Sequence, residues 1–442
     1  MTAPSARADR FDLNALALRF LTTRRPGRFL TWVARTPVPV MSADRFASRV
    51  PTSPIDRETS PLVELFESPP AVAGLLDGDV AIKDQIDVAG RPTGVGLAGV
   101  GEVATVDATI VARIKAAGGR IAGKAKMTEL GIDGLGTVMH YAMPANPLVP
   151  GYSPGGSSTG TAVAVATGLV RYGVGGDGLG SIRIPAAFNG LYGLKPSRDR
   201  VPRDGIRSPV RTLDAVGPIA RTATDCATLW SVMAGEPAAT LAPWVPDRVG
   251  VLAARGMRAS RAVTLAVQRA LAALGVVQER VALPGIECAT FLGGMIGAYE
   301  LASGPFGDRA STGAGRLSRA IGTAIGEHDA QRLYAQRDAL RLATHRALAR
   351  TPILAMPTTA IPPPAITSEL VARGPELMLL RALGAFTPLA NLTDLPAIAI
   401  PCGVEERGRP LSIMFVTERG GETNLLRIAL AMEQLGLATK PI

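Results

Sequence analysis

The chain has 442 residues, of which 47% are apolar, and it contains 49 glycines and 35 prolines. This composition is typical of a loop-rich globular α/β protein and excludes an intrinsically disordered chain. The formal net charge is +10, but the basic residues are scattered singly and only 4% of residues are aromatic. We therefore expect a solvated basic surface and no nucleic-acid partner.

The cysteines and the hydropathy pattern indicate in which cellular compartment the protein is expected. Cys226, Cys288 and Cys402 are far apart in the sequence, without a C-x-x-C pair, which argues against a disulfide framework and a zinc site. The arginine-rich first 30 residues lack the apolar core of a signal peptide, and no apolar run reaches the length of a membrane helix. We expect a cytoplasmic protein with no membrane span.

The predicted elements change in character along the chain. Residues 1–75 are predicted to be an irregular layer packed on the core, with one short amphipathic piece around residues 13–21. From Asp79 onward, short apolar runs alternate with helical patterns, which is typical of a sheet covered by helices. The predicted strands are residues 80–82, 120–122, 248–253, 353–356, 397–400 and 411–416. The predicted helices are residues 109–117, 159–167, 222–233, 262–274, 328–349 and 423–435. We expect a single large α/β domain over residues 76–442, with a central twisted mixed sheet.

One lysine and two serines carry the chemistry that the sequence suggests. Ser157 and Ser181 lie 24 residues apart in glycine-rich turns, and Lys83 follows the predicted strand 80–82. Only six of the 47 basic residues are lysines and 41 are arginines, so a lysine here suggests an amine that must lose its proton. A buried neutral amine can activate a serine, and a second serine can relay the proton because a hydroxyl both donates and accepts. These residues predict acyl transfer.

Other well-known motifs match only superficially. The two G-x-G-x-x-G matches, at 94–99 and 173–178, do not clearly open a helix in a βαβ unit, which disfavours dinucleotide binding. The P-loop-like stretch 118–124 is followed by Ala125 where a Ser or Thr would hold magnesium. The G-x-S-x-G match at 156–160 follows prolines instead of a strand, and only His328 and His345 come later in the chain. We expect no α/β-hydrolase triad, no metal and no cofactor, and a structural role for His345.

The motifs together resemble the amidase signature family of amide hydrolases. The resemblance includes V-A-I-K-D around Lys83, G-G-S-S-T-G around Ser157 and D-G-L-G-S-I-R around Ser181. It also includes G-K-A-K-M-T-E-L from Gly123, G-L-K-P-S-R from Gly193, and the block 386–403. It extends from about Asp79 to the C-terminus and implies the family's fold for residues 76–442.

The same resemblance implies a role for each reactive residue. Lys83 would be the base, Ser157 the relay with a cis peptide bond before it, and Ser181 the nucleophile. Backbone amides in the turn can converge on the carbonyl oxygen that becomes negative during attack, and glycine permits the close approach. The expected oxyanion residues are Gly178, Leu179, Gly180 and the amide of Ser181. The expected supporting residues are Asp177, Arg183, Ser158 and Thr159.

The sequence departs from the family pattern at three positions. The family's G-G-S is Leu179-Gly180-Ser181 here, and Thr159 stands where the family has a glycine. A leucine at this place would narrow the acyl pocket, or would strain the turn if a positive φ were required there. The late glycine before the Leu-Pro pair is Asp394.

Several functions remain open at the level of the sequence. The leading hypothesis is an amidase that hydrolyses a small-molecule carboxamide through a seryl acyl-enzyme. The first alternative is a biosynthetic acyltransferase or cyclase that passes the acyl group to an amine. The second is the glutaminase subunit of a tRNA-dependent amidotransferase, and the third is an inactive scaffold of the same fold. Family members are often dimers, so a homodimer is an open expectation.

Overall fold

The computed structural model describes residues 60–67, 73–99, 101–237, 241–253, 257–373 and 377–437. Most of the predicted N-terminal layer, including the piece around residues 13–21, lies outside these ranges. Within that layer, strand β1 (Leu62–Leu65) pairs antiparallel with β5 (Arg120–Ala125). The division of the chain at residue 75 stays a prediction.

The fold is built on one mixed sheet of 11 strands within the described residues. The other strands of this sheet are β2 (Asp79–Lys83), β6 (Tyr172–Asp177), β7 (Tyr192–Lys195), β8 (Ala215–Ala220), β9 (Arg248–Leu252), β10 (Val277–Val281), β11 (Ile353–Pro357), β12 (Ala397–Val404) and β13 (Pro410–Thr417). Their order is β1-β5-β2-β6-β8-β7-β12-β13-β11-β9-β10. β2 runs parallel to β5 and β6, whereas β12 and β13 are antiparallel. The short strands β3 (Pro92–Thr93) and β4 (Glu102–Val103) pair separately.

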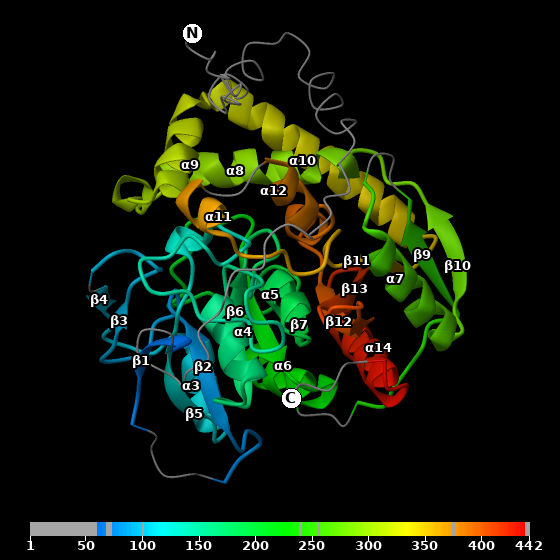
Figure 1. Ribbon diagram of the computed structural model, residues 1–442, viewed down its shortest axis with the longest axis horizontal. Coiled ribbons are helices and arrows are strands. Elements are labelled where there is room, and N and C mark those ends of the chain that lie inside the picture. The colour runs from blue at the N-terminus through cyan, green and yellow to red at the C-terminus, as the bar shows by residue number, and fades with distance from the viewer. Residues whose placement is uncertain are drawn as a thin grey trace, which may run out of the picture.

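Helices cover both faces of this sheet (Figure 1). They are α3 (Thr109–Ala116), α4 (Thr159–Ala166), α5 (Arg183–Phe188), α6 (Ala223–Ala234), α7 (Arg261–Leu274), α8 (Ala289–Ser303), α9 (Gly313–Ala324), α10 (Glu327–Leu348), α11 (Ser368–Arg373), α12 (Leu377–Leu383), α13 (Pro388–Leu392) and α14 (Glu422–Gln434). Among the described residues, none of these helices combines the length and the apolar character needed to cross a bilayer. The predicted α/β architecture with a mixed central sheet is confirmed.

Alternation along the strands explains how the helices divide between the faces. Successive strand residues point to opposite sides of a sheet. Val80 and Ile82 of β2 belong to one buried cluster, which also contains residues of α3, α6, α7 and α14. Ala81 belongs to another cluster, which contains residues of α4 and α5. In β13, Phe415 belongs to the first of these clusters, while Met414 belongs to a cluster with residues of α8, α10 and α13. Figure 1 shows α8, α9 and α10 grouped together beyond the central strands.

All the predicted strands and helices have counterparts in the structure, with ends that shift by a few residues. The sequence did not predict the strands β6, β7, β8 and β10, nor the helices α5, α8, α9, α11, α12 and α13. β6 was missed because its Tyr-Gly-Val-Gly-Gly-Asp segment is rich in a residue that strands disfavour. The structure gives the reason for two of these glycines. A Cβ on Gly175 would lie 2.9 Å from Ser158 Oγ, and a Cβ on Gly176 would lie 2.6 Å from Gln85 Oε1. The G-x-G-x-x-G match at 173–178 is therefore a strand crowded by polar side chains.

Helices α8 and α9 pack at a contact that has no room for a side chain at Gly322. A Cβ added there would overlap the backbone carbonyl of Ala298. We expect Gly322→Ala to destabilise the protein by about 2 kcal/mol or more, because overpacking outweighs the gain of about 1 kcal/mol in helix propensity. The apparent Tm should fall by about 2 °C or more, measured by thermal unfolding.

Gly313→Ala, at the start of the same helix, is the matched control. A Cβ there meets nothing within 4 Å, so this variant should keep the Tm of the parent protein. Equal Tm values for the two variants would contradict the tight α8–α9 contact.

Candidate active site

Strands β2 and β6 bring two sequence motifs to one edge of the sheet. The strands are adjacent and parallel, with Ile82 paired to Val174, so their carboxyl ends lie at the same edge. β2 ends at Lys83 and β6 ends at Asp177. This edge is where ligands bind in open α/β sheets.

The Lys83 side chain reaches the first of the predicted serines. Lys83 is almost fully buried, and its Nζ donates to Ser157 Oγ at 2.8 Å and to Gly176 O at 3.0 Å. The peptide bond between Gly156 and Ser157 is cis. Burial lowers the pKa of Lys83 to about 8, against the opposing negative charges of Asp214 and Asp177. A neutral amine is therefore accessible at mildly alkaline pH.

Hydrogen bonds join the two serine-bearing turns to each other. The backbone N–H of Ser158 donates to Ser181 O at 3.2 Å. The Ser158 hydroxyl donates to Gly176 O at 3.1 Å, and the Thr159 hydroxyl donates to Gly155 O at 2.8 Å. Ser158 and Thr159 thus hold the first turn against the end of β6, and the half-buried Ser181 begins the next turn.

A buried ion pair organises the turn that carries Ser181. Both side chains of the Asp177–Arg183 pair are fully buried, with Arg183 Nη2 2.9 Å from Asp177 Oδ1 and Nε 2.9 Å from Oδ2. The same carboxylate accepts the backbone N–H groups of Gly180 at 2.7 Å and Ile182 at 3.1 Å. Burial alone would raise the pKa of Asp177, but the Arg183 guanidinium holds it well below its usual range. Asp177 is therefore ionised.

A distant segment completes the environment of this ion pair. Arg183 donates to Thr387 O and to Asn391 Oδ1, each at 2.7 Å. The Asn391 amide donates to Asp177 O at 2.8 Å, and the Thr387 hydroxyl donates to Leu179 O at 2.7 Å. Sequence reasoning assigned no role to Thr387 or Asn391. The one signal for them in the sequence was their place in the block 386–403.

A buried glutamate links the site to helix α9. Glu129 has a fully buried side chain, which accepts from the backbone N–H groups of Ser311 at 2.8 Å and Thr312 at 3.1 Å. It also contacts His140 Nε2 at 3.0 Å. Two residues later, a Cβ on Gly131 would lie 3.3 Å from Ser157 Oγ. The residues around Glu129 therefore connect α9 to the environment of Ser157.

Comparison with known proteins now decides the family. The amidase family model matches residues 71–287 and 295–426. The chain belongs to the amidase (amidase signature) family.

Three similar proteins illustrate this membership. A glutamyl-tRNA(Gln) amidotransferase subunit from Thermus thermophilus is 32% identical over 408 residues, covering 82% of this chain and 85% of that protein. The putative amidase AmiB2 of Mycobacterium tuberculosis is 45% identical over 155 residues, which are 35% of this chain and 34% of the relative. In such high-identity matches the chain spans about a third of the relative's length. A crystal structure of an amidase superposes with a TM-score of 0.73 at 28% identity, covering 81% of this chain and 85% of that one.

The leucine that replaces a family glycine does not strain the amidase turn. The positive φ in this turn belongs to Gly180, at +130°, whereas Leu179 has no positive φ. A Cβ on Gly180 would also lie 2.5 Å from Thr387 Oγ1. Glycine is therefore required at 180 and is not required at 179, so the expected strain at Leu179 is absent.

The third departure from the amidase pattern, Asp394, does adopt a left-handed conformation, with φ of +60°. Aspartate tolerates this region better than most residues. Its carboxylate also binds two arginines of α10, with Arg337 Nη2 at 2.9 Å and Arg341 Nη2 at 2.7 Å. These ion pairs compensate for the loss of glycine.

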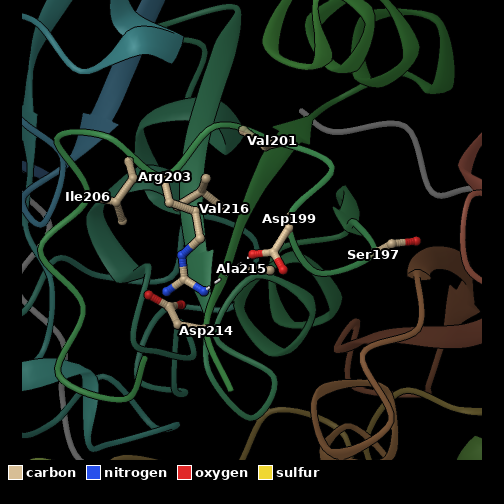
Figure 2. A pocket seen from close by; sticks show the side chains of 8 residues that line it. All are labelled: Ser197, Asp199, Val201, Arg203, Ile206, Asp214, Ala215 and Val216. Carbon is tan, nitrogen blue, oxygen red and sulfur yellow. Dashed lines mark ion pairs between the residues drawn. The ribbon is translucent and has the colours of Figure 1, made fainter. Parts of the chain in front are cut away.

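Figure 2 shows the side chains that line a pocket at the start of β8. The lining residues are Ser197, Asp199, Val201, Arg203, Ile206, Asp214, Ala215 and Val216. Asp214 connects it to the site, because its Oδ2 accepts from Gln85 Nε2 at 2.8 Å and its charge raises the pKa of Lys83. Neither Ser157 nor Ser181 lines this pocket.

The Asp177–Arg183 pair generates a stability prediction. Arg183→Ala leaves a buried carboxylate without its cation, and we expect a loss of about 3–5 kcal/mol in the free energy of unfolding. Arg183→Lys keeps the charge but loses the two-pronged contact, so its loss should be intermediate. Urea unfolding followed by circular dichroism measures both.

Arg248→Ala is the control, because that arginine is 57% exposed in its ion pair with Glu279. Its effect should stay within about 0.5 kcal/mol. If Arg183→Ala were as mild as this control, the central role of the buried pair would be wrong.

Proposed function

We propose that this protein hydrolyses the carbon–nitrogen bond of a small-molecule carboxamide through a seryl acyl-enzyme. Ser181 is the nucleophile, Ser157 the proton relay and Lys83 the base. The observation that carries the proposal is the 2.8 Å hydrogen bond from Lys83 Nζ to Ser157 Oγ at a buried site. A lysine whose pKa is lowered to about 8 can hold the proton that leaves the serines.

The proposed reaction moves one proton along three side chains. The Ser181 oxygen attacks the carbonyl carbon while its proton passes to Ser157, whose own proton passes to neutral Lys83. The same route then delivers the proton to the leaving nitrogen as the carbon–nitrogen bond breaks, releasing ammonia or an amine. Water attacks the acyl-enzyme by the same relay, and Ser181 is regenerated with release of the carboxylic acid.

We assign the oxyanion donors more narrowly than the sequence suggested. The Gly180 amide donates to Asp177 Oδ1 at 2.7 Å, so it is engaged within the turn. The proposed donors to the developing oxyanion are the backbone N–H groups of Gly178, Leu179 and Ser181. Asp177 and Arg183 support these donors by holding the turn.

The comparisons support amide chemistry and also favour a second candidate. A putative amidase is among the relatives, and an amidase crystal structure is among the similar folds. The match to the Thermus amidotransferase subunit extends over 85% of that protein, which favours the glutaminase subunit of a tRNA-dependent amidotransferase as the alternative. Transfer of the acyl group to an amine, by an acyltransferase or cyclase, requires only that an amine replace water. A cytoplasmic location and a homodimer complete the proposal.

The pH dependence tests the base. Only neutral Lys83 accepts a proton, so kcat/KM should rise about tenfold per pH unit and level off above about pH 8, following the lowered pKa. Lys83→Gln should lower kcat by about 10²–10⁴-fold and remove this rise. Initial rates on a primary amide between pH 5 and 10 provide the measurement.

Lys195 offers a matched control for the pH profile. Burial also lowers its pKa to about 8, and its Nζ donates to Pro196 O at 2.6 Å. Lys195→Gln should keep the rising limb. If the rise of kcat/KM with pH disappeared in Lys195→Gln but persisted in Lys83→Gln, Lys195 would be the titrating group and the proposed role of Lys83 would be wrong.

Product analysis separates hydrolysis from transfer. We expect a fluorophosphonate to label Ser181, and Ser181→Ala to lose both labelling and turnover. With added hydroxylamine, a hydrolase should still release mainly the carboxylic acid, whereas an acyltransferase should release mainly the hydroxamate, as quantified by mass spectrometry. Hydrolysis of glutamine only after addition of partner subunits would favour the amidotransferase alternative.

A further inference from the structure

Two glycines on α8 form notches that face the turn carrying Ser181. Gly293 and Gly297 are one helical turn apart and therefore lie on the same side of the helix. A Cβ on Gly293 would lie 2.5 Å from Leu179 Cδ2. A Cβ on Gly297 would lie 3.5 Å from Val210 Cγ1, and a Cβ on Gly178 would lie 3.0 Å from Val210 Cγ2. Leu179 and Val210 thus fill the space between the turn and α8.

Two contacts hold Leu179 in place, one through its backbone carbonyl and one through its side chain. Its carbonyl oxygen accepts from the Thr387 hydroxyl at 2.7 Å, and its side-chain methyl sits in the Gly293 notch. Leu179 is only half-buried, and it lies two residues before Ser181. Its exposed part is therefore an apolar surface next to the nucleophile.

We propose that Leu179, seated in the Gly293 notch, is the end wall of the acyl pocket and limits the substrates to amides with short, uncharged acyl groups. This inference rests on the proposed amide hydrolysis at Ser181. An apolar wall gives a charged acyl group no partner, and burying a charge without one is costly. A fixed wall also excludes additional methylenes, because overpacking a closed space requires displacement of the wall.

The test compares straight-chain primary amides from acetamide to octanamide. The parent enzyme should lose kcat/KM as the acyl chain lengthens. Leu179→Gly should raise the kcat/KM ratio of octanamide to acetamide by about 10–200-fold, the range that pocket contacts with methylenes provide. Leu179→Met, similar in volume, should keep the parent preference.

Adjacent glycines on α8 give a matched pair of variants. Gly293→Ala pushes the Leu179 side chain toward Ser181 and should lower kcat/KM for butanamide more than for acetamide. Gly294→Ala adds the same methyl where nothing lies within 4 Å of the new Cβ, and it should keep the parent values. The double variant Leu179→Gly/Gly293→Ala should recover activity, because the group that collides is gone.

The possible results distinguish a failure of this inference from a failure of the proposed amide hydrolysis. If neither amide turnover nor labelling of Ser181 by a small alkyl fluorophosphonate occurs in the parent enzyme, amide hydrolysis itself is wrong. If the parent hydrolyses amides but prefers octanamide, or if Leu179→Gly keeps the parent preference, the wall is wrong. If Leu179→Gly does not fold, the Gly293→Ala and Gly294→Ala pair decides, and identical chain-length profiles for that pair overturn the inference.

Discussion

The Asp177–Arg183 ion pair is the contact on which the rest of the site depends. Both side chains are fully buried, so neither charge can be left alone without a large penalty. The carboxylate accepts backbone amides of the turn, while the guanidinium binds Thr387 and Asn391 more than 200 residues later. One pair of charges therefore holds together the end of β6, the Ser181 turn and the start of α13.

Two buried lysines near the same sheet edge, Lys83 and Lys124, differ in the partners of their amines. Lys124 is buried like Lys83, and it donates to Ile86 O at 2.6 Å and lies 3.5 Å from Asp84. Burial lowers the pKa of Lys124, and the nearby Asp84 opposes this effect. The Lys83 amine donates hydrogen bonds to Ser157 Oγ and Gly176 O, and neither of these acceptors is a carboxylate. The two lysines thus have similar burial but different partners, and Lys83 is the one whose amine contacts a serine of the proposed relay.

The sequence predicted the parts of this molecule that depend on local pattern. Apolar runs and helical periodicity predicted six of the strands and six of the helices from Asp79 onward. Residue chemistry selected Lys83 and Ser157, whose side chains are in contact. Whether Ser181 acts as the nucleophile stays a prediction. The strand β6 was missed because its glycines are required by neighbours that only the fold brings close. Thr387 and Asn391 could not be given roles because their partners are distant in sequence, and no periodicity encodes such contacts.

Asp394 makes the effect of one substitution depend on others. Its backbone conformation is one that glycine adopts freely, yet its carboxylate neutralises Arg337 and Arg341 on α10. In this chain, the family's glycine would relax the backbone but would leave the nearly buried Arg337 without its carboxylate. The three residues therefore form an epistatic unit, and the order in which a lineage exchanges them determines which intermediates are stable.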